Sequence, residues 1–370
     1  MRVGLDIRAL TAAPYSGVGR QALALYNTVR MRTDTEAVPF TNAPLTHQHR
    51  TWACCPARPV SIEALQRPLE RYRFERDFLP EAISAMAVDV YIATANMGLP
   101  IGLTDVRRKR TKWVLQVQDL FQFQQREGRR SSGLKARLDQ QCDRWSVRHA
   151  MRLADVIWVP SSFTAEMVLD QFPDTASRLR LLADAVPLEA WQRLHQDVFA
   201  PQRYWLVVGT HAPRKNINWF LAAWQQAHDT WPDLIPPLVV IGHPRDVKAV
   251  PPQVRFVHGL NDAQLGNWYR QAERLWHPAL AEGFGLPVIE AAACGTPVAT
   301  AKGSALDEIT PAGAPRFDPR DEVSLVQLMN RLARQGRGEE ESIEALQAWA
   351  RRYDLPAYAV RVDELLKELA

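Results

Sequence analysis

Short apolar runs alternate along this chain with amphipathic stretches of ten or more residues, and this alternation limits the possible folds more than any other feature. Strands that alternate with helices pair in parallel, because each crossover helix returns the chain to the same end of the sheet. The pattern therefore predicts an α/β protein. In the first half the apolar runs lie at 2–7, 88–93, 112–118, 155–161 and 179–184, with a helical segment at 134–153.

The second half repeats this pattern, and 370 residues exceed what one core of ordinary size needs. We expect two Rossmann-like, doubly wound domains whose strand ends face a central cleft, because ligands in open α/β sheets bind beyond the carboxyl ends of the strands. The second set of runs lies at 204–209, 237–242, 254–259, 273–278 and 296–301. The expected divisions are an N-terminal domain at 1–198, a C-terminal domain at 199–345 and a terminal helical segment beginning between 340 and 346 that packs back on the first domain, with the linker at 195–204.

Composition excludes several classes of protein. The first residues carry charges at Asp6 and Arg8 and so lack the apolar region of a signal peptide, and no stretch of eighteen uncharged apolar residues occurs. These features predict a cytoplasmic protein. The four cysteines show no C-x-x-C spacing, which argues against zinc or a redox dithiol and favours buried free thiols; they are Cys54, Cys55, Cys142 and Cys294.

Charge is distributed unevenly along the chain. Residues 1–200 carry a net charge of +6 and residues 201–370 a net charge of −2. The densest basic runs are Arg107–Lys112 and Arg71–Arg76. Such runs are typical of a solvated face, and they also suit anionic lipid headgroups or an acidic acceptor.

The stretch "EGFGLPVIE" places two carboxylates, Glu282 and Glu290, on either side of a glycine turn. Pro287 suits the first turn of a helix that ends at Gly295. The free N–H groups at such a helix start favour phosphate, and glycines let a ligand approach the backbone. Two carboxylates that each suit a polyhydroxyl ring describe a nucleotide sugar. The alternative is a capping turn with two solvent-facing glutamates.

A second stretch, "VVGTHAPRKN", follows the first strand of the second half. The strand is expected to end at Gly209 and the next helix to begin near Asn216, so Arg214 and Lys215 lie in the intervening loop. Two cations there would neutralise a diphosphate and stabilise it as a leaving group. The alternative is a basic pair on the surface.

A third stretch, "PYSGVGRQALALY", has the spacing G-x-G-x-x-A at Gly17, Gly19 and Ala22. In a dinucleotide fingerprint the glycines follow the strand at once, whereas about nine residues separate Gly17 from Ile7 here. We therefore expect a longer glycine loop that closes over phosphate or sugar, and we exclude a nicotinamide dehydrogenase.

Taken in order, these motifs resemble the retaining, GT-B-fold glycosyltransferases of family 4, the group 1 glycosyltransferases. The resemblance extends over nearly the whole chain and is most specific in the second half. Its motifs are "GLDIRAL…SGVGR", "VQDL", "VPSSFTAEMV", "VVGTHAPRKN", "HGLNDAQLGNWYRQAERLWHPALAEGFGLPVIEAAACGTPVATA" and "SALDEI".

The resemblance implies a role for each matching residue. Glu282 would contact the donor sugar, Glu290 the ribose, and Arg214 with Lys215 the diphosphate. The remaining donor-binding positions would be Gly17, Gly19, Gly209, Gly283, Phe284, Gly285 and Leu286.

Three departures from the family pattern stand out. Gln118-Asp119 replaces the usual His-Asp, Ala212 replaces a glutamate, and Asp184-Ala185 replaces Asn-Gly. Gln118 can hydrogen-bond a hydroxyl but cannot take a proton, so either proton transfer falls to the leaving phosphate or activity is reduced. Asp119 is the candidate of the first half for a covalent mechanism. No Asp-x-Asp occurs, so no metal is expected, and no cofactor beyond the nucleoside-diphosphate sugar.

The resemblance implies a retaining, metal-independent hexosyltransferase that uses a mannose-like donor such as GDP-mannose. The acceptor would be a glycan or a lipid-linked glycan in surface polysaccharide synthesis, with the basic N-terminal domain at the anionic inner face of the plasma membrane; no nucleic acid is involved. A sugar-nucleotide epimerase, a phosphorylase and a sugar-nucleotide-binding protein without turnover stay open as alternatives.

Overall fold

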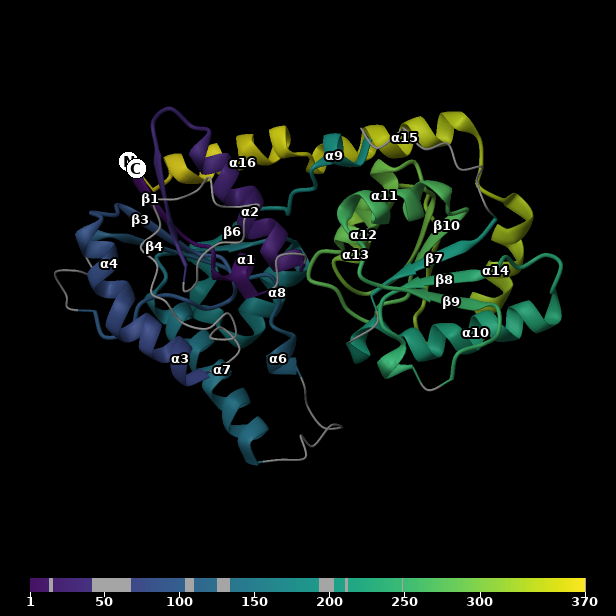
Figure 1. The fold of residues 1–370 in the computed structure, drawn as a ribbon, viewed down its shortest axis with the longest axis horizontal. Coiled ribbons are helices and arrows are strands. Elements are labelled where there is room, and N and C mark those ends of the chain that lie inside the picture. Colours follow the sequence, from purple (N-terminus) through teal and green to yellow (C-terminus); the bar gives the residue numbers. More distant parts are fainter. Residues whose placement is uncertain are drawn as a thin grey trace. The chain divides into compact units, whose positions relative to one another are not determined.

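The protein consists of two compact units, shown in Figure 1. Unit 1 comprises residues 1–185 and 358–370, and unit 2 comprises residues 186–357. The structure is a computed structural model. It describes residues 1–12, 16–41, 68–103, 110–124, 134–192, 203–209, 212–247 and 249–369.

Unit 1 is built on a six-stranded sheet of order β2-β1-β3-β4-β5-β6, in which every pairing is parallel. The five predicted runs form five of its strands. The sixth, β2, was not predicted; it contains Pro39, which lacks an N–H donor and is tolerated because β2 lies at the edge of the sheet. The strands are β1 Arg2–Asp6, β2 Glu36–Phe40, β3 Val90–Ala93, β4 Lys112–Gln116, β5 Val156–Val159 and β6 Leu179–Leu181.

Helices cover both faces of this sheet (Figure 1). On one face lie α2 (Gly17–Arg30) and α16 (Leu355–Lys367), which are joined by an ion pair between Arg32 and Asp363. The other face carries α3 (Pro68–Arg73), α4 (Leu79–Ala85), α7 (Leu134–Leu153) and α8 (Ser162–Gln171). The remaining helical elements of unit 1 are α1 Arg8–Ala12, η3 Phe74–Phe78, α6 Phe121–Gln124 and η4 Pro173–Arg178.

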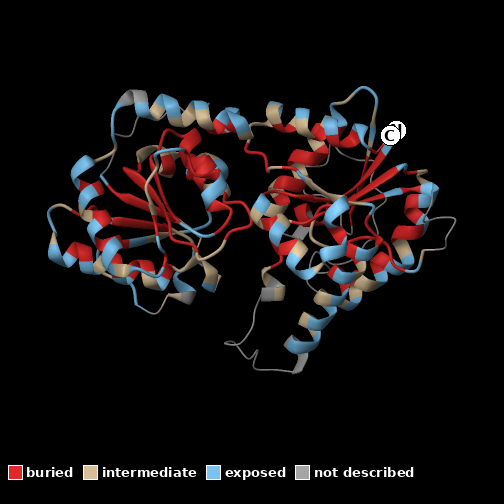
Figure 2. Ribbon diagram, turned by 180° about the vertical axis from the view of Figure 1, so that it is seen from behind, coloured by how far each residue is buried: buried red, intermediate tan, exposed pale blue. Residues whose placement is uncertain are grey.

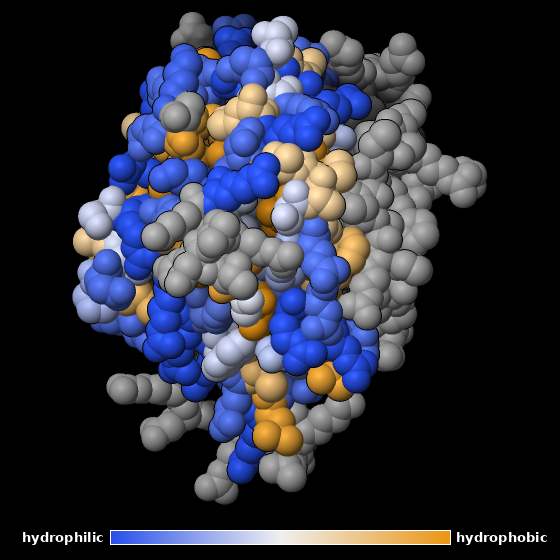
Figure 3. Space-filling view, turned by 90° about the vertical axis from the view of Figure 1, so that its left-hand side faces the viewer, coloured by the Kyte–Doolittle hydropathy of each residue, from blue (hydrophilic) through white to orange (hydrophobic). Residues whose placement is uncertain are grey.

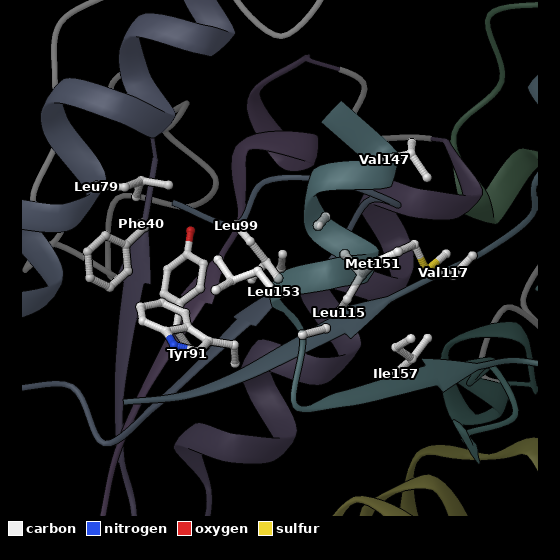
Figure 4. Close-up of a cluster of buried hydrophobic side chains, with 14 of the residues drawn as sticks. Phe40, Leu79, Tyr91, Leu99, Leu115, Val117, Val147, Met151, Leu153 and Ile157 are labelled. Atoms are coloured by element: carbon white, nitrogen blue, oxygen red, sulfur yellow. The ribbon is translucent and has the colours of Figure 1, made fainter. Parts of the chain in front are cut away.

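The core of unit 1 lies between its sheet and the second set of helices (Figure 4). Tyr91 from β3 meets Phe40 from β2 edge to face, with ring centroids 5.3 Å apart. Leu115 of β4 and Met151 of α7 lie in the same cluster and are fully buried. At about 25 cal/mol per Å² of apolar surface, burying one such side chain is worth about 1.5–3 kcal/mol.

Unit 2 has a second parallel sheet, of order β12-β11-β10-β7-β8-β9. The five predicted runs are again present, and the short edge strand β12 was not predicted. The strands are β7 Trp205–Val208, β8 Leu238–Ile241, β9 Val254–Val257, β10 Arg274–His277, β11 Val298–Ala301 and β12 Arg316–Phe317.

Two helices, α10 (Ile217–Thr230) and α14 (Glu322–Gln335), pack together on one face of this sheet, and α11 (Asp262–Gln271), α12 (Leu286–Ala293) and α15 (Glu340–Ala350) lie on the other. Figure 2 shows the strands buried and the outer sides of these helices exposed. The shorter elements of unit 2 are α9 Leu188–Gln192, η5 Pro213–Lys215, η6 Pro244–Asp246, α13 Leu306–Ile309 and η7 Arg351–Tyr353.

Two predictions were wrong in detail. The terminal helical segment is not continuous, because η7 and Asp354 separate α15 from α16. The Asp354 carboxylate accepts a hydrogen bond from the Ala357 N–H, and Pro356 lies in the first turn of α16. Cys294 is a buried thiol as expected, but Cys142 is exposed.

Some sequence predictions lie outside the described residues: Cys54, Cys55, Arg107–Lys109 and most of the linker at 195–204. In the part of the chain that the structure describes, no helix is both long enough and apolar enough to span a bilayer.

Candidate functional site

The order of the strands in unit 2 marks one position where a ligand site is expected. Chain connections run outward in opposite directions from the neighbouring strands β7 and β10, so a crevice opens at their carboxyl ends. The pairing of Val207 with Trp276 brings the loop after β7 beside the loop after β10. These are the loops that carry Arg214, Lys215 and Glu282.

The structure brings those three predicted residues together as an ion cluster. Nη1 of Arg214 donates to Oε2 of Glu282 at 2.8 Å, and Nζ of Lys215 donates to Oε1 of the same carboxylate. Arg214 also donates to the Ala281 carbonyl at 3.1 Å. The exposed fraction of the side chain falls from 30% for Arg214 to 8% for Glu282, so the carboxylate is the inner member of the cluster.

Charge decides the ionisation of Glu282. Burial by itself would raise the pKa of this carboxyl, but the Lys215 charge, the hydrogen bond from His277 and the Arg214 charge outweigh it and hold the pKa well below its ordinary value. The carboxylate is therefore ionised at neutral pH. Two cations facing one anion leave the cluster with a net positive charge.

His277, the last residue of β10, is a fourth member that the sequence analysis missed. Its Nε2 lies 3.1 Å from Oε1 of Glu282. Burial lowers the pKa of the imidazole, so we assign the neutral ring with the proton on Nε2. Nδ1 is then an acceptor, and it has no hydrogen-bond partner among the residues described. The sequence signal that could have identified His277 is its position at the carboxyl end of a strand, five residues before Glu282.

Glycines shape both loops of the cluster. Gly209 has φ +93°, and a Cβ there would lie 3.4 Å from Cε of Lys215, so glycine leaves room for the lysine side chain. Gly285 has φ +110°, and a Cβ there would lie 2.9 Å from Cδ2 of Leu306. No side chain larger than hydrogen fits at the start of α12 without displacing Leu306.

The helix start after this glycine has the predicted form. Leu286 and Pro287 form the first turn of α12, and Gly295 follows its end with φ +71°. Phe284 is buried and packs edge to face on Tyr353, and Gly283 is also buried. Phe284 therefore anchors the loop that presents the free N–H groups of the helix.

Glu290 lies apart from the ion cluster. Its side chain is buried, and Oε2 accepts a hydrogen bond from the Tyr269 hydroxyl at 2.9 Å. Tyr269, from α11, was not identified from the sequence. The burial of Glu290 is at odds with the alternative of two solvent-facing glutamates, because Glu282 is buried as well.

In unit 1 the glycine motif has a different structure from the one predicted. Gly17 and Gly19 form the first turn of α2 rather than a loop, and the Gly19 N–H donates to Oγ of Ser16 at 3.0 Å. A serine one residue ahead of the helix accounts for this, because it caps the helix and lets the helix start at the glycine.

Gln118 and Asp119 follow β4 and are held by Asn96, which the sequence analysis did not identify. The Gln118 N–H donates to Oδ1 of Asn96 at 2.7 Å, and Nδ2 of Asn96 donates to the Asp119 carbonyl at 2.8 Å. Asp184 follows β6 in the same unit. Burial raises the pKa of its carboxyl to about 7, against the opposing effect of the neighbouring Gln118 side chain.

A family model and a curated relative match parts of this chain. Residues 202–335 match the family model described as group 1 glycosyl transferases. Over 201 residues the chain is 28% identical to O-antigen chain mannosyltransferase B of Escherichia coli, a match that covers 48% of this chain and 51% of that protein. The chain thus spans about half the length of this curated relative.

Solved structures resemble the whole chain. Sucrose-phosphate synthase from Thermosynechococcus elongatus aligns with a TM-score of 0.69 and 19% identity, covering 100% of this chain and 99% of that one. Anabaena HepE, in a complex with UDP, aligns with a TM-score of 0.66 and 14% identity, covering 99% of each chain. These likenesses confirm the predicted fold class.

Proposed function

We propose that this chain, a GT-B protein whose residues 202–335 match the group 1 glycosyltransferases, moves a hexose from a nucleoside-diphosphate sugar to a glycan or glycolipid acceptor. The observation that carries the proposal is the ion cluster of Arg214, Lys215 and Glu282 beside the start of α12. The cluster combines two cations, a carboxylate and free N–H groups at the edge of the sheet where ligands bind.

Arg214 and Lys215 would stabilise the leaving group. In the structure they grip the two oxygens of one carboxylate from two sides, the arrangement that two oxygens of a diphosphate require. As the bond to the sugar breaks, negative charge grows on the diphosphate, and preorganised cations lower the energy of that state. The N–H groups at the start of α12 carry partial positive charge and add hydrogen-bond donors to the two cations.

Glu282 would then act on the sugar. When a phosphate accepts a hydrogen bond from Arg214 or Lys215 in place of Glu282, one carboxylate oxygen of Glu282 is released. That oxygen can then accept a hydrogen bond from a sugar hydroxyl. His277 keeps the carboxylate oriented through Nε2. Glu290 stays the proposed ribose contact, with the Tyr269 hydroxyl as the group that ribose hydroxyls would replace or join.

The finer chemistry follows from the residues at hand. We propose retention at the anomeric carbon, with the acceptor proton passing to the departing phosphate oxygen, because Gln118 has no basic nitrogen to receive it. Asp119 stays the candidate carboxylate for a covalent route. No metal is required, since the two cations carry the charge that a divalent ion would carry.

A mannose-like donor is supported by the similarity to the Escherichia coli O-antigen chain mannosyltransferase, which also supports a role in surface polysaccharide synthesis. The UDP bound by HepE supports a nucleoside diphosphate more generally. We propose GDP-mannose as the first donor to try, and a lipid-linked glycan, met at an anionic membrane surface, as the acceptor.

The test is a thermal-shift panel with GDP, UDP, ADP and dTDP, each alone and as hexose conjugates, with NAD as the control. A ligand at 100 times its Kd adds about 2.7 kcal/mol of stability, which raises Tm by a few degrees. One base should shift Tm selectively, and Lys215→Ala should abolish the shift while Arg331→Ala on the exposed side of α14 keeps it. A wild-type protein that responds to no nucleotide would contradict the proposal.

A second candidate is a sugar-nucleotide-binding protein without turnover, favoured by Gln118, which can donate a hydrogen bond but cannot act as a base. Product analysis separates the two. Nucleotide binding without transfer to any glycan and without slow donor hydrolysis would favour the binding protein.

A further inference from the structure

Unit 1 has a groove between α3 and α7. The groove has a volume of about 1010 Å³ and is lined from α3 by Pro68, Leu69 and Tyr72. From α7 it is lined by Leu138 and Trp145, among others. The Tyr72 and Trp145 rings, one from each helix, pack against each other at a tilt, with centroids 6.0 Å apart.

Large apolar side chains at the groove are exposed. Leu69 is 60% exposed, Leu138 52% and Trp145 46%. The other exposed large apolar residues that the structure describes lie singly on different elements, whereas these three share one groove. Figure 3 shows hydrophobic patches set among hydrophilic surface on the side of unit 1. A clustered apolar surface of this kind marks a binding surface, because leaving it in water is unfavourable.

A second hollow, of about 390 Å³, adjoins the groove along α7, and Arg148 lines both. This hollow is polar, with Arg152 on α7 and Asp174 opposite. Asp174 is paired with Arg178 at 3.6 Å. Within the described parts of the chain, neither Arg148 nor Arg152 forms an ion pair. The two hollows together offer an apolar slot that leads to two arginines with no ion-pair partner among the described residues, and Asp174, which shares the second hollow, is paired with Arg178.

We propose that this surface binds an anionic phospholipid at a membrane: an acyl chain lies in the α3–α7 groove and the phosphate meets Arg148 and Arg152. A ligand that matches both hollows must be apolar along its length and anionic at one end. Trp145 and the arginine stems suit the interface, where an apolar body and a polar tip are both satisfied. The inference rests on the proposed function only in giving the enzyme access to a lipid-linked acceptor.

The test is vesicle flotation of the full chain with phosphatidylcholine alone and with added phosphatidylglycerol. Binding should need the anionic lipid and weaken with salt. Arg148→Gln with Arg152→Gln should reduce apparent affinity roughly thirtyfold, since each arginine near an anionic surface contributes about fivefold. Leu138→Ser and Trp145→Ala should each reduce it about tenfold. The matched controls, Arg331→Gln and Val323→Ser on exposed positions of α14, should leave it unchanged.

A second readout keeps the apolar and arginine residues of the groove unchanged and labels Cys142 instead. Cys142 is exposed and lines the groove, so a polarity-sensitive dye attached there in a Cys54→Ser, Cys55→Ser background should report an apolar environment only with anionic vesicles. Equal flotation with neutral vesicles, or full binding by the double arginine variant, overturns the proposal. The proposal is also overturned if the wild-type chain is a dimer in solution that Trp145→Ala dissociates while flotation is unchanged. The groove would then be an interface between two copies of this chain.

The outcome is separable from that of the proposed function. The groove variants should keep the wild-type thermal response to nucleotide, because α3 and α7 belong to unit 1 and the ion cluster to unit 2. Normal nucleotide binding with no flotation defeats the lipid site alone. Flotation without any nucleotide response defeats the glycosyltransferase alone.

Discussion

Replacing Glu282 by glutamine should tighten the binding of a nucleoside diphosphate while abolishing transfer. Glu282 pairs with both Arg214 and Lys215, so an incoming phosphate must compete with this carboxylate for the two cations. Glutamine keeps the shape of the side chain and removes its charge. The variant cations would then be available to phosphate, but the sugar would lose a carboxylate contact.

The size of the effect follows from the cluster geometry. A pair of unit charges about 4 Å apart at an effective dielectric constant of about 20 interacts by about 4 kcal/mol, and Arg214, which is partly exposed, gains less. If phosphate binding removes a third to a half of the interaction energy of one ion pair, the loss makes the binding free energy less favourable by about 1–2 kcal/mol. Removing that cost should tighten diphosphate binding about five- to thirtyfold. Without nucleotide, the free energy of unfolding of the Glu282→Gln variant should be about 1–3 kcal/mol lower than that of the wild type, because two cations lose their anion.

Isothermal titration with the nucleoside diphosphate and thermal denaturation measure the two effects on one sample. Glu344→Gln, at an exposed position of α15, is the matched control and should change neither. Transfer should fall at least about a hundredfold. Unchanged or weaker diphosphate binding by Glu282→Gln would refute the reasoning, since it would mean that phosphate does not compete with this carboxylate.

Four further outcomes are expected. Lys215→Ala should reduce kcat/KM about a hundredfold, or about 2.7 kcal/mol, measured with the donor identified by the thermal panel; wild-type turnover would remove Lys215 from the phosphate site. Because burial raises the folded-state pKa of Asp184 to about 7, the proton it holds stabilises the fold below its unfolded pKa, and this contribution is lost as pH rises through 7. Asp184→Asn should therefore be more stable than wild type at pH 8 in urea denaturation, by a margin that shrinks as pH falls towards the ordinary carboxyl pKa of about 4. The same margin at every pH would show that the Asp184 carboxyl has an ordinary pKa. Gly285→Ala should cost about 2–4 kcal/mol, from φ strain plus the contact with Leu306, whereas Gly303→Ala, with φ +93° and no atom within 4 Å of its Cβ, should cost about 1 kcal/mol from strain alone. Excess chelator should leave turnover unchanged, and a loss restored by manganese would contradict the metal-independent mechanism.

The sequence was most informative where one physical cause acts locally. Apolar runs predicted ten strands because parallel strands buried on both faces need continuous apolar residues. The short edge strands β2 and β12 were missed because edge strands need less apolar surface and, in β2, tolerate Pro39. Gly17 and Gly19 were misplaced because glycine spacing alone does not reveal that Ser16 caps a helix.

The candidate site shows a similar division. Arg214, Lys215 and Glu282 were identified by motif, and their meeting depends on the adjacency of β7 and β10, which strand runs alone do not specify. The mutual pairing of the three was not foreseen, because a motif describes a site with its ligand present. His277 and Tyr269 were missed for a different reason: a single histidine or tyrosine in an apolar strand or helix carries no pattern of its own.

The two units differ in how the chain completes them. Unit 2 is one continuous stretch, whereas unit 1 takes Tyr358–Ala370 from after unit 2, and Tyr358 and Val362 of α16 are fully buried in it. During synthesis, unit 2 can fold as soon as its own residues have left the ribosome. Unit 1 begins before unit 2 and is completed after it, so the sheet face beneath α16 stays open to chaperones until α16 emerges. A chain truncated after Ala357 would therefore have a folded unit 2 attached to an incomplete unit 1.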